Sequence, residues 1–232
     1  MTTTLSSGAN TTERAGAVTI VPSRRILWLL AVILPIGPAC VALARYLLPY
    51  TTADDNAEIV RSVVANPGAQ GVVLWLAFVA VLTLVPGAAA AGLVTRAGAP
   101  RLTTVAVCLL VPGYISLGYL VGSDAMLWAG AVKDVDQATL LTLWETMHGS
   151  GMAAGGVFVI GHVLGTVLLG IAMWRSRSVP RWAAVATAVS QPLHFVAAVI
   201  VGSHTLDLFA WGLTAVGMAA CSYVLLSREI GR

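Results

Sequence analysis

The stretch that decides the fold is MAAGGVFVIGHVLGTVLLGIAMW, residues 152–174, which contains no Asp, Glu, Lys or Arg. About 20 apolar residues in helical conformation span the hydrocarbon core of a bilayer, so this stretch predicts a transmembrane helix. Five other stretches of comparable length and hydrophobicity are found at 26–49, 71–95, 102–122, 182–201 and 206–226. The sequence therefore predicts an all-α polytopic membrane protein, a bundle of six transmembrane helices.

The composition excludes a soluble domain. Hydrophobic residues make up 58% of the 232 positions and charged residues 10%, and the mean hydropathy is +0.87. The net charge of +3 does not indicate a nucleic-acid partner, because the basic residues lie in short loops between the spans. Residues 1–23 are rich in Thr, Ser, Gly and Ala, and predict a disordered cytoplasmic tail before a membrane domain at 24–232.

The loops between the predicted spans alternate in charge along the chain. One set, with the chain ends, carries Arg14, Arg24, Arg25, Arg96, Arg101, Arg175, Arg177, Arg181, Arg228 and Arg232. The other set carries Asp54, Asp55, Glu58, Asp124, Asp134, Asp136, Glu145 and Asp207. The positive-inside rule then predicts a cell-membrane protein with both termini in the cytoplasm. Arg45, near the outer membrane edge, is expected to snorkel outward or to pair with an outer carboxylate.

Two outer loops each contain a candidate short helix. Asp55–Ala65 has apolar residues on one side, and Asp136–His148 has apolar residues at helical spacing with Asp134 or Asp136 as the N-cap. Amphipathic segments at this level lie in the membrane interface or cover a cavity. We therefore expect both helices at the outer surface.

Two histidines inside the spans mark the candidate site. His162 and His194 lie about 15 Å and about 12 Å below the outer ends of their spans, so they share one level. Ionisable groups inside a bilayer are costly unless they face a partner or a wet cavity. We therefore expect a cavity that opens outward or into the outer leaflet. The side chains predicted to bind a substrate there are Trp75, Tyr114, Trp144, Gln191 and Trp211.

A carboxylate after the first span, Glu58, and another at the head of the last span, Asp207, accompany this length and number of spans. In these features the chain resembles the integral-membrane terpene cyclases of meroterpenoid and indole-sesquiterpene biosynthesis. The resemblance implies that Glu58 and Asp207 are the catalytic acids that start carbocation cyclisation of a lipophilic, isoprenoid-like substrate. Such an acid must be shielded from water. Aromatic rings would stabilise the carbocation, and His162 or His194 would take the closing proton.

Neither a metal nor another cofactor is expected. Cys40, Cys108 and Cys221 all lie within apolar spans without a histidine at metal-ligand spacing, and they predict buried free thiols. The chain also lacks a DDxxD-type cluster, which argues against a metal-dependent diphosphate enzyme.

Other functions fit the same residues. A proton-coupled transporter or binding protein for a small molecule would use the His162–His194 pair to sense or carry protons. A haem protein is the next alternative, because His148 and His162 have the His-x13-His spacing of transmembrane cytochromes b, and His162 with His194 could form one bis-histidine site. The motif HGSG at 148–151 faintly resembles the GxSG motif of rhomboid proteases. The expected partners are a lipophilic small molecule and membrane lipid.

Overall fold

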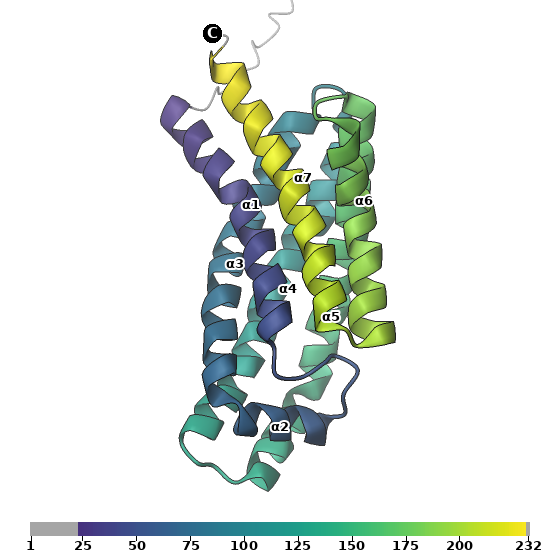
Figure 1. Cartoon of the computed structure of the whole chain (residues 1–232). Helices are drawn as coiled ribbons and strands as arrows, with labels where there is room; N and C mark the ends of the chain where they lie inside the picture. Colours follow the sequence, from purple (N-terminus) through teal and green to yellow (C-terminus); the bar gives the residue numbers. More distant parts are fainter. Residues whose placement is uncertain (1–22, 231–232) are drawn as a thin grey trace, which may run out of the picture.

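The computed structural model describes residues 23–230, and these fold into helices joined by short loops (Figure 1). The elements are α1 (Arg24–Leu47), α2 (Asn56–Ala65), α3 (Pro67–Thr95), α4 (Pro100–Val132), α5 (Gln137–Ser176), α6 (Arg181–Phe195), the π-helical turn η1 (Val196–Val201) and α7 (His204–Ile230). Six helical stretches are long and apolar enough to cross a membrane. The predicted all-α fold with six transmembrane helices is confirmed. The tail predicted for residues 1–23 lies, except for Ser23, outside the described residues.

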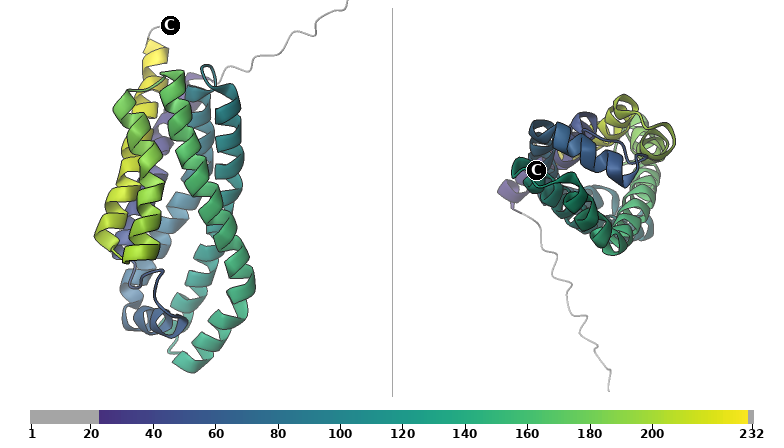
Figure 2. Two further views of the ribbon diagram at one scale, coloured as in Figure 1. Left: turned by 90° about the vertical axis from the view of Figure 1, so that its right-hand side faces the viewer. Right: turned by 90° about the horizontal axis from the view of Figure 1, so that it is seen from below.

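The six spanning helices form a closed ring. Helix α1 packs against α3 and α7, and the ring continues from α3 through α4, α5 and α6 back to α7. Viewed from the end that carries α2, the helices surround a common axis (Figure 2). Side chains that point inward from different helices can therefore meet near this axis.

The second predicted outer helix, Asp136–His148, is not a separate element. It is continuous with the following span in the 40-residue helix α5, which is about 60 Å long at 1.5 Å per residue. The prediction of a break was wrong because Gly149–Gly151 contains no proline, and glycine only weakens a helix. Asp136 is the N-cap as predicted and accepts a hydrogen bond from Thr139 N at 2.9 Å. The hydrogen bonds from Thr139 hold the pKa of Asp136 below its usual range.

The first predicted outer helix is confirmed as α2, which lies across one end of the bundle (Figure 2). Its apolar side packs into a cluster in which Ile59 and Val63 are buried together with Leu127 of α4 and Leu140 of α5. Trp144 Nε1 donates a hydrogen bond to Asn56 Oδ1 at 3.1 Å, which ties α5 to α2. The ends of α4 and α5 and the helix α2 therefore form a packed cap on the bundle.

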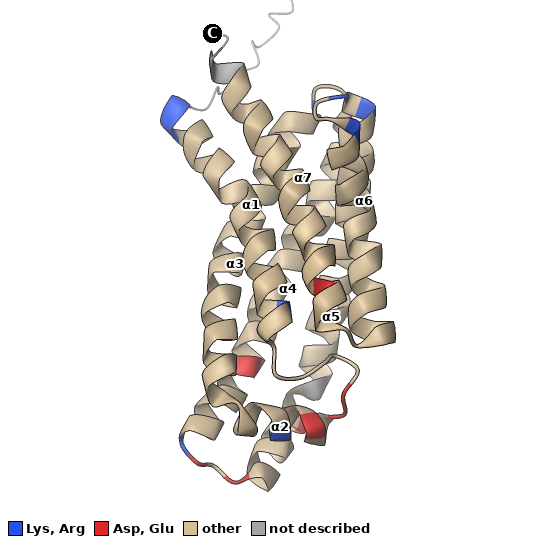
Figure 3. Ribbon diagram, in the orientation of Figure 1, with Lys and Arg blue, Asp and Glu red and all other residues tan. Residues whose placement is uncertain are grey.

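Charged residues separate to the two ends of the described bundle (Figure 3). Most Arg lie at the end that carries the start of α1 and the turn between α5 and α6, whereas most Asp and Glu lie toward the α2 cap, together with Arg61 and Lys133. This separation agrees with the alternation predicted from the loops. The two ends are called the arginine-rich end and the acidic end below.

Glycines allow α4 and α5 to cross in close contact. A Cβ atom placed on Gly161 would lie 2.6 Å from the carbonyl oxygen of Leu109 and 2.8 Å from Cα of Gly113. Backbones can approach this closely only where side chains are absent, as in other membrane helix pairs. The contact fixes α5 just beside His162, the residue that follows Gly161.

Gly161→Ala is expected to lower the unfolding free energy by roughly 1–3 kcal/mol, because the new methyl group has no space at the crossing. The matched control is Gly156→Ala in the same helix, where an added Cβ meets no atom within 4 Å. The control should be neutral or stabilising by up to about 1 kcal/mol, since alanine favours helix over glycine. Thermal unfolding in detergent compares the two variants. Equal unfolding temperatures would contradict the close contact.

Candidate functional site

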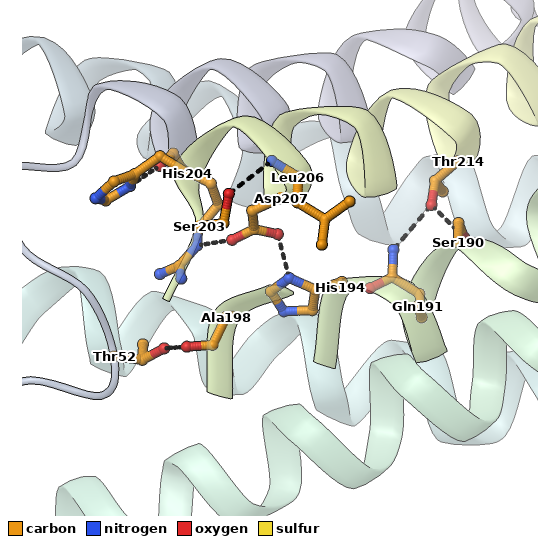
Figure 4. Close-up of polar contacts among 11 residues, drawn as sticks. Thr52, Ser190, Gln191, His194, Ala198, Ser203, His204, Leu206, Asp207 and Thr214 are labelled. Atoms are coloured by element: carbon orange, nitrogen blue, oxygen red, sulfur yellow. Dashed lines mark hydrogen bonds and ion pairs between the residues drawn. The ribbon is translucent and has the colours of Figure 1, made fainter. Parts of the chain in front are cut away.

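A buried carboxylate, Asp207, joins three helices in the acidic half of the bundle. It lies in the first turn of α7, its side chain is 1% exposed, and its two oxygens have different partners (Figure 4). Oδ2 accepts a hydrogen bond from Nε of Arg45 in the last turn of α1 at 2.6 Å. Oδ1 lies 2.5 Å from Nδ1 of His194 in α6. A carboxylate so deeply buried requires such partners to remain charged, and Arg45 and the helix N-terminus favour its ionised form.

The chain reverses sharply between α6 and α7, and this brings His194 opposite Asp207. Pro192 lies inside α6, and the helix widens into the π-helical turn η1 before it ends. Gly202 has a positive φ of 66°, and the following Ser203 N donates to the carbonyl of Ala197 at 2.9 Å. Glycine adopts this left-handed conformation at little cost. π-Helical turns inside helices are frequent at functional sites.

Arg45 links Asp207 to a second carboxylate, Asp124 of α4. Tyr50 donates a hydrogen bond to Asp124 Oδ1 at 2.7 Å, and Arg45 is close enough to interact electrostatically with both groups. Burial and the neighbouring Asp124 carboxylate raise the pKa of Tyr50 well above its ordinary value, so its hydroxyl stays protonated. His204 Nδ1 lies 2.8 Å from the carbonyl oxygen of Arg45, to which it donates. The Arg45 side chain is only 18% exposed.

Two histidines and a tryptophan stack next to this ion pair. The His162 ring is parallel to Trp211, with centroids 5.6 Å apart, and its centroid lies 5.3 Å from that of His194. Trp211 meets His194 edge-on at 5.4 Å. His162 is fully buried, and its Nδ1 donates to the carbonyl of Phe158 at 2.6 Å. The other ring nitrogen, Nε2, therefore carries no proton in neutral His162, and it has no hydrogen-bond partner among the described residues.

A second polar layer lies one helical turn closer to the arginine-rich end. Gln191 Nε2 donates to Thr214 Oγ1 at 2.8 Å, and Thr214 donates to Ser190 Oγ at 2.8 Å. Gln191 Oε1 and Thr166 Oγ1 are buried without a partner among the described residues. Each residue of this layer lies one helical turn from a residue of the first layer and on the same face of its helix. The pairs are Gln191 with His194 on α6, Thr166 with His162 on α5, and Thr214 with Trp211 on α7. The two layers form one polar column along the ring axis.

The column ends at an apolar layer. Tyr114, Thr166 and Thr214 line a hollow of about 10 Å³, roughly the space of one water molecule. The same hollow is bounded by the apolar residues Leu34, Leu84, Leu110, Leu169 and Met218. The polar column thus reaches from the acidic end to the middle of the bundle, where this apolar layer follows it.

The structure brings together six of the nine predicted site residues. They are His162, His194, Asp207, Trp211, Gln191 and Tyr114.

The other three predicted residues lie elsewhere. Glu58 pairs with Arg61 on α2 and its side chain is 43% exposed, so it is not shielded from water. Trp75 is 73% exposed on α3, where its ring meets only Phe78 among the described aromatic rings. Trp144 belongs to the cap. The cavity expected around the histidines is also smaller than a substrate would need, because the hollow beside the column has the volume of about one water molecule. Close stacking of Trp211 with the histidines fills that space.

The histidine pair does not favour haem. Phe158 and Trp211 stack on His162, and the adjacent hollow of about 10 Å³ cannot hold a macrocycle. The side chain of His148 lies outside the described part of the structure. The Ser150 hydroxyl forms hydrogen bonds with the Tyr119 hydroxyl and the Met147 carbonyl, which gives no support to a rhomboid-like serine. Among the side chains that the structure describes, no group of three or more His, Cys, Asp or Glu is arranged to hold a metal ion.

These features define a class: a polytopic membrane protein with six spanning helices and a buried His–Asp–Arg cluster in one half of the bundle. The chain belongs to the family described as a domain of unknown function, DUF4386, which matches residues 26–227. No curated protein and no solved structure matches the chain.

Proposed function

We propose that this protein is a proton-coupled membrane transporter or binding protein for a small molecule, in which His194 accepts and releases the proton. The observation that carries the proposal is the hydrogen bond between His194 and Asp207, whose carboxylate is also bound by Arg45. We further propose that both termini are cytoplasmic, because the arginine-rich end satisfies the positive-inside rule. The polar column then opens from the non-cytoplasmic side of the cell membrane.

The charges of the cluster support a single mobile proton. With His194 neutral, its Nδ1–H donates to Asp207 and its Nε2 is free to accept a proton. Arg45 and Asp207 carry opposite charges, so protonated His194 adds one positive charge directly beside the Asp207 carboxylate. Opposite charges within a few ångströms stabilise the charged form of a buried group. The cluster can therefore hold one extra proton.

His162 is the next acceptor along the column. Its unpartnered Nε2 is buried, and its ring lies 5.3 Å from that of His194. Two imidazolium ions at this separation would repel strongly, so the pair holds one proton rather than two. A proton that leaves His194 can pass to His162, either directly or through water. The apolar layer beyond Tyr114 prevents the proton from moving on to the arginine-rich end. In alternating access, a transporter is closed toward one side of the membrane in each of its states.

The test is direct titration of the histidines by NMR on ¹⁵N-histidine-labelled protein in nanodiscs. The expected result is that one imidazole of the His162–His194 pair gains a proton as the pH is lowered through the range in which the protein stays folded, and that this signal is lost in His194→Gln. His204→Gln is the matched control, since that ring donates to a backbone carbonyl outside the pair. If neither His162 nor His194 changes protonation in this range, the proposal fails.

An acid-initiated cyclase for a lipophilic, isoprenoid-like substrate remains the second candidate. Asp207, Trp211 and Tyr114 lie along one column, as that chemistry needs. However, Asp207 is ion-paired and Glu58 is exposed, so neither carboxyl has the apolar surroundings of a strong proton donor. Turnover of a farnesylated substrate by the purified protein would favour the cyclase over the transporter.

A further inference from the structure

A separate hollow of about 500 Å³ lies at the arginine-rich end, between the α3–α4 turn and the α5–α6 turn. Its volume falls within the ordinary range of ligand pockets, roughly 300–1,000 Å³. The charged side chains that line it are Arg101, Arg175, Arg177 and Arg181, and Trp174 contributes an aromatic wall. This hollow is separate from the polar column and from the apolar layer at which the column ends.

The four arginines have no acidic partner among the side chains that the structure describes, where the ion pairs are those of Arg45, Arg61 and His194. Four positive charges around one hollow repel one another and create a local positive potential. An anion in the hollow relieves this repulsion. Guanidinium groups suit phosphate in particular, because their N–H donors match its oxygens in pairs.

The backbone around the hollow adds to its preference for anions. Helices α4 and α6 begin there, at Pro100 and Arg181, and neither has a side-chain cap. Their first N–H groups point out of the helix and carry the positive end of the helix dipole. Such helix starts bind phosphate groups in many proteins.

Two contacts fix the shape of the hollow. The Arg181 guanidinium lies over the Trp174 ring, 5.3 Å from its centroid. A Cβ atom placed on Gly98 would lie 2.6 Å from Cα of Ser176, so the two turns touch through a position that only glycine can occupy. The α3–α4 and α5–α6 turns, which carry the arginines, are therefore packed against each other and do not form two independent loops.

We propose that this hollow holds the phosphate group of an anionic phospholipid from the leaflet at the arginine-rich end. The hollow lies at the ends of the spanning helices, where lipid head groups are found, and the exposed Trp174 and Trp182 are typical of the membrane interface. Basic pockets between transmembrane helices are known to bind such head groups. The lipid phosphate accepts hydrogen bonds from the arginines and helix starts, while its acyl chains stay in the bilayer.

The experiment titrates short-chain phosphatidylglycerol into the detergent-purified full-length protein and records the dissociation constant by native mass spectrometry. Arg175→Gln/Arg181→Gln should weaken binding roughly 25-fold, at about five-fold for each arginine removed. Arg24→Gln/Arg96→Gln is the matched control, because Arg24 begins α1 and Arg96 ends α3 at the same end of the bundle, and neither lines the hollow. The control should bind within about two-fold of the wild type, since exposed charges outside the site are largely screened.

Each other outcome overturns the proposal. Equal losses in the two double variants would mean attraction to surface charge in general. Equal affinity for phosphatidylcholine of the same chain length would mean that the negative charge is not recognised. If inorganic phosphate competes at the same concentration as the lipid, the ligand is soluble. Arg101→Gln, which leaves the Trp174–Arg181 contact intact, replaces the double variant if the latter does not fold, and should weaken binding about five-fold.

Discussion

Asp207→Asn is expected to destabilise the protein by about 3–5 kcal/mol, because the buried Arg45 guanidinium loses the carboxylate to which it is hydrogen-bonded. The variant keeps the shape of the side chain, so the loss measures charge rather than packing. Arg45 and Asp207 are 18% and 1% exposed, and solvent screens their interaction little. The measurement is the apparent unfolding temperature in detergent at a fixed scan rate, since unfolding of membrane proteins is often irreversible.

The control for this prediction removes both charges. Arg45→Gln/Asp207→Asn should recover most of the stability lost in Asp207→Asn, because a neutral pair has no buried charge to compensate. Proton binding by His194 should stay impaired in the double variant, since no carboxylate remains to stabilise the imidazolium. If Asp207→Asn alone unfolds at the wild-type temperature, Asp207 is not the charge partner of Arg45.

His162→Ala and His162→Phe separate packing from proton transfer. His162→Ala removes a fully buried ring that stacks on Phe158 and Trp211, so it should cost roughly 3–5 kcal/mol. His162→Phe keeps an aromatic ring and should retain most of the stability, but it removes Nε2. We expect the pH dependence of function to be lost in both variants.

Arg96→Gln is the reference for these two variants, because Arg96 is exposed at the end of α3, in the turn at the arginine-rich end. Thermal unfolding reports stability, and the histidine titration described above reports protonation. Unchanged titration of His194 in His162→Phe would mean that His162 only packs.

The fold could be predicted because a bilayer imposes a simple rule on length and hydrophobicity. Six long apolar stretches correspond to the six spanning helices, and the charged loops correspond to the two ends. The break before residue 152 was predicted wrongly because the outer part of α5 is amphipathic and the inner part is apolar. A helix does not end merely because its surroundings change, and neither a proline nor a capping residue marks a helix end near residue 150.

The site could be predicted where spacing along one helix was enough. Gln191 and His194 share a face of α6, Asp207 and Trp211 share a face of α7, and depth alone placed His162 at the level of His194. Rotation of a helix about its axis could not be predicted for α3, which is apolar on all sides, and so Trp75 was expected inside although it faces outward.

Contacts between distant parts of the chain could not be found from spacing. Arg45 was expected to snorkel or to pair with an outer carboxylate, and it pairs with Asp207, 162 residues away. Asp124 and Tyr50 were missed because each looks like an ordinary loop or interface residue. Thr166 and Thr214 were missed because a threonine in an apolar span usually bonds its own helix. The signal that could have found them is their position one turn from His162 and Trp211.

The long hairpin of α4 and α5 offers a way to image this protein by electron cryo-microscopy. A small bundle hidden in a detergent belt gives particle images few landmarks for alignment. The turn at Lys133–Asp136 lies at the outer tip of two helices that continue unbroken into the membrane. A rigid helical fusion partner inserted at this turn, in register with both helices, should supply a fiducial mark whose orientation reports that of the bundle.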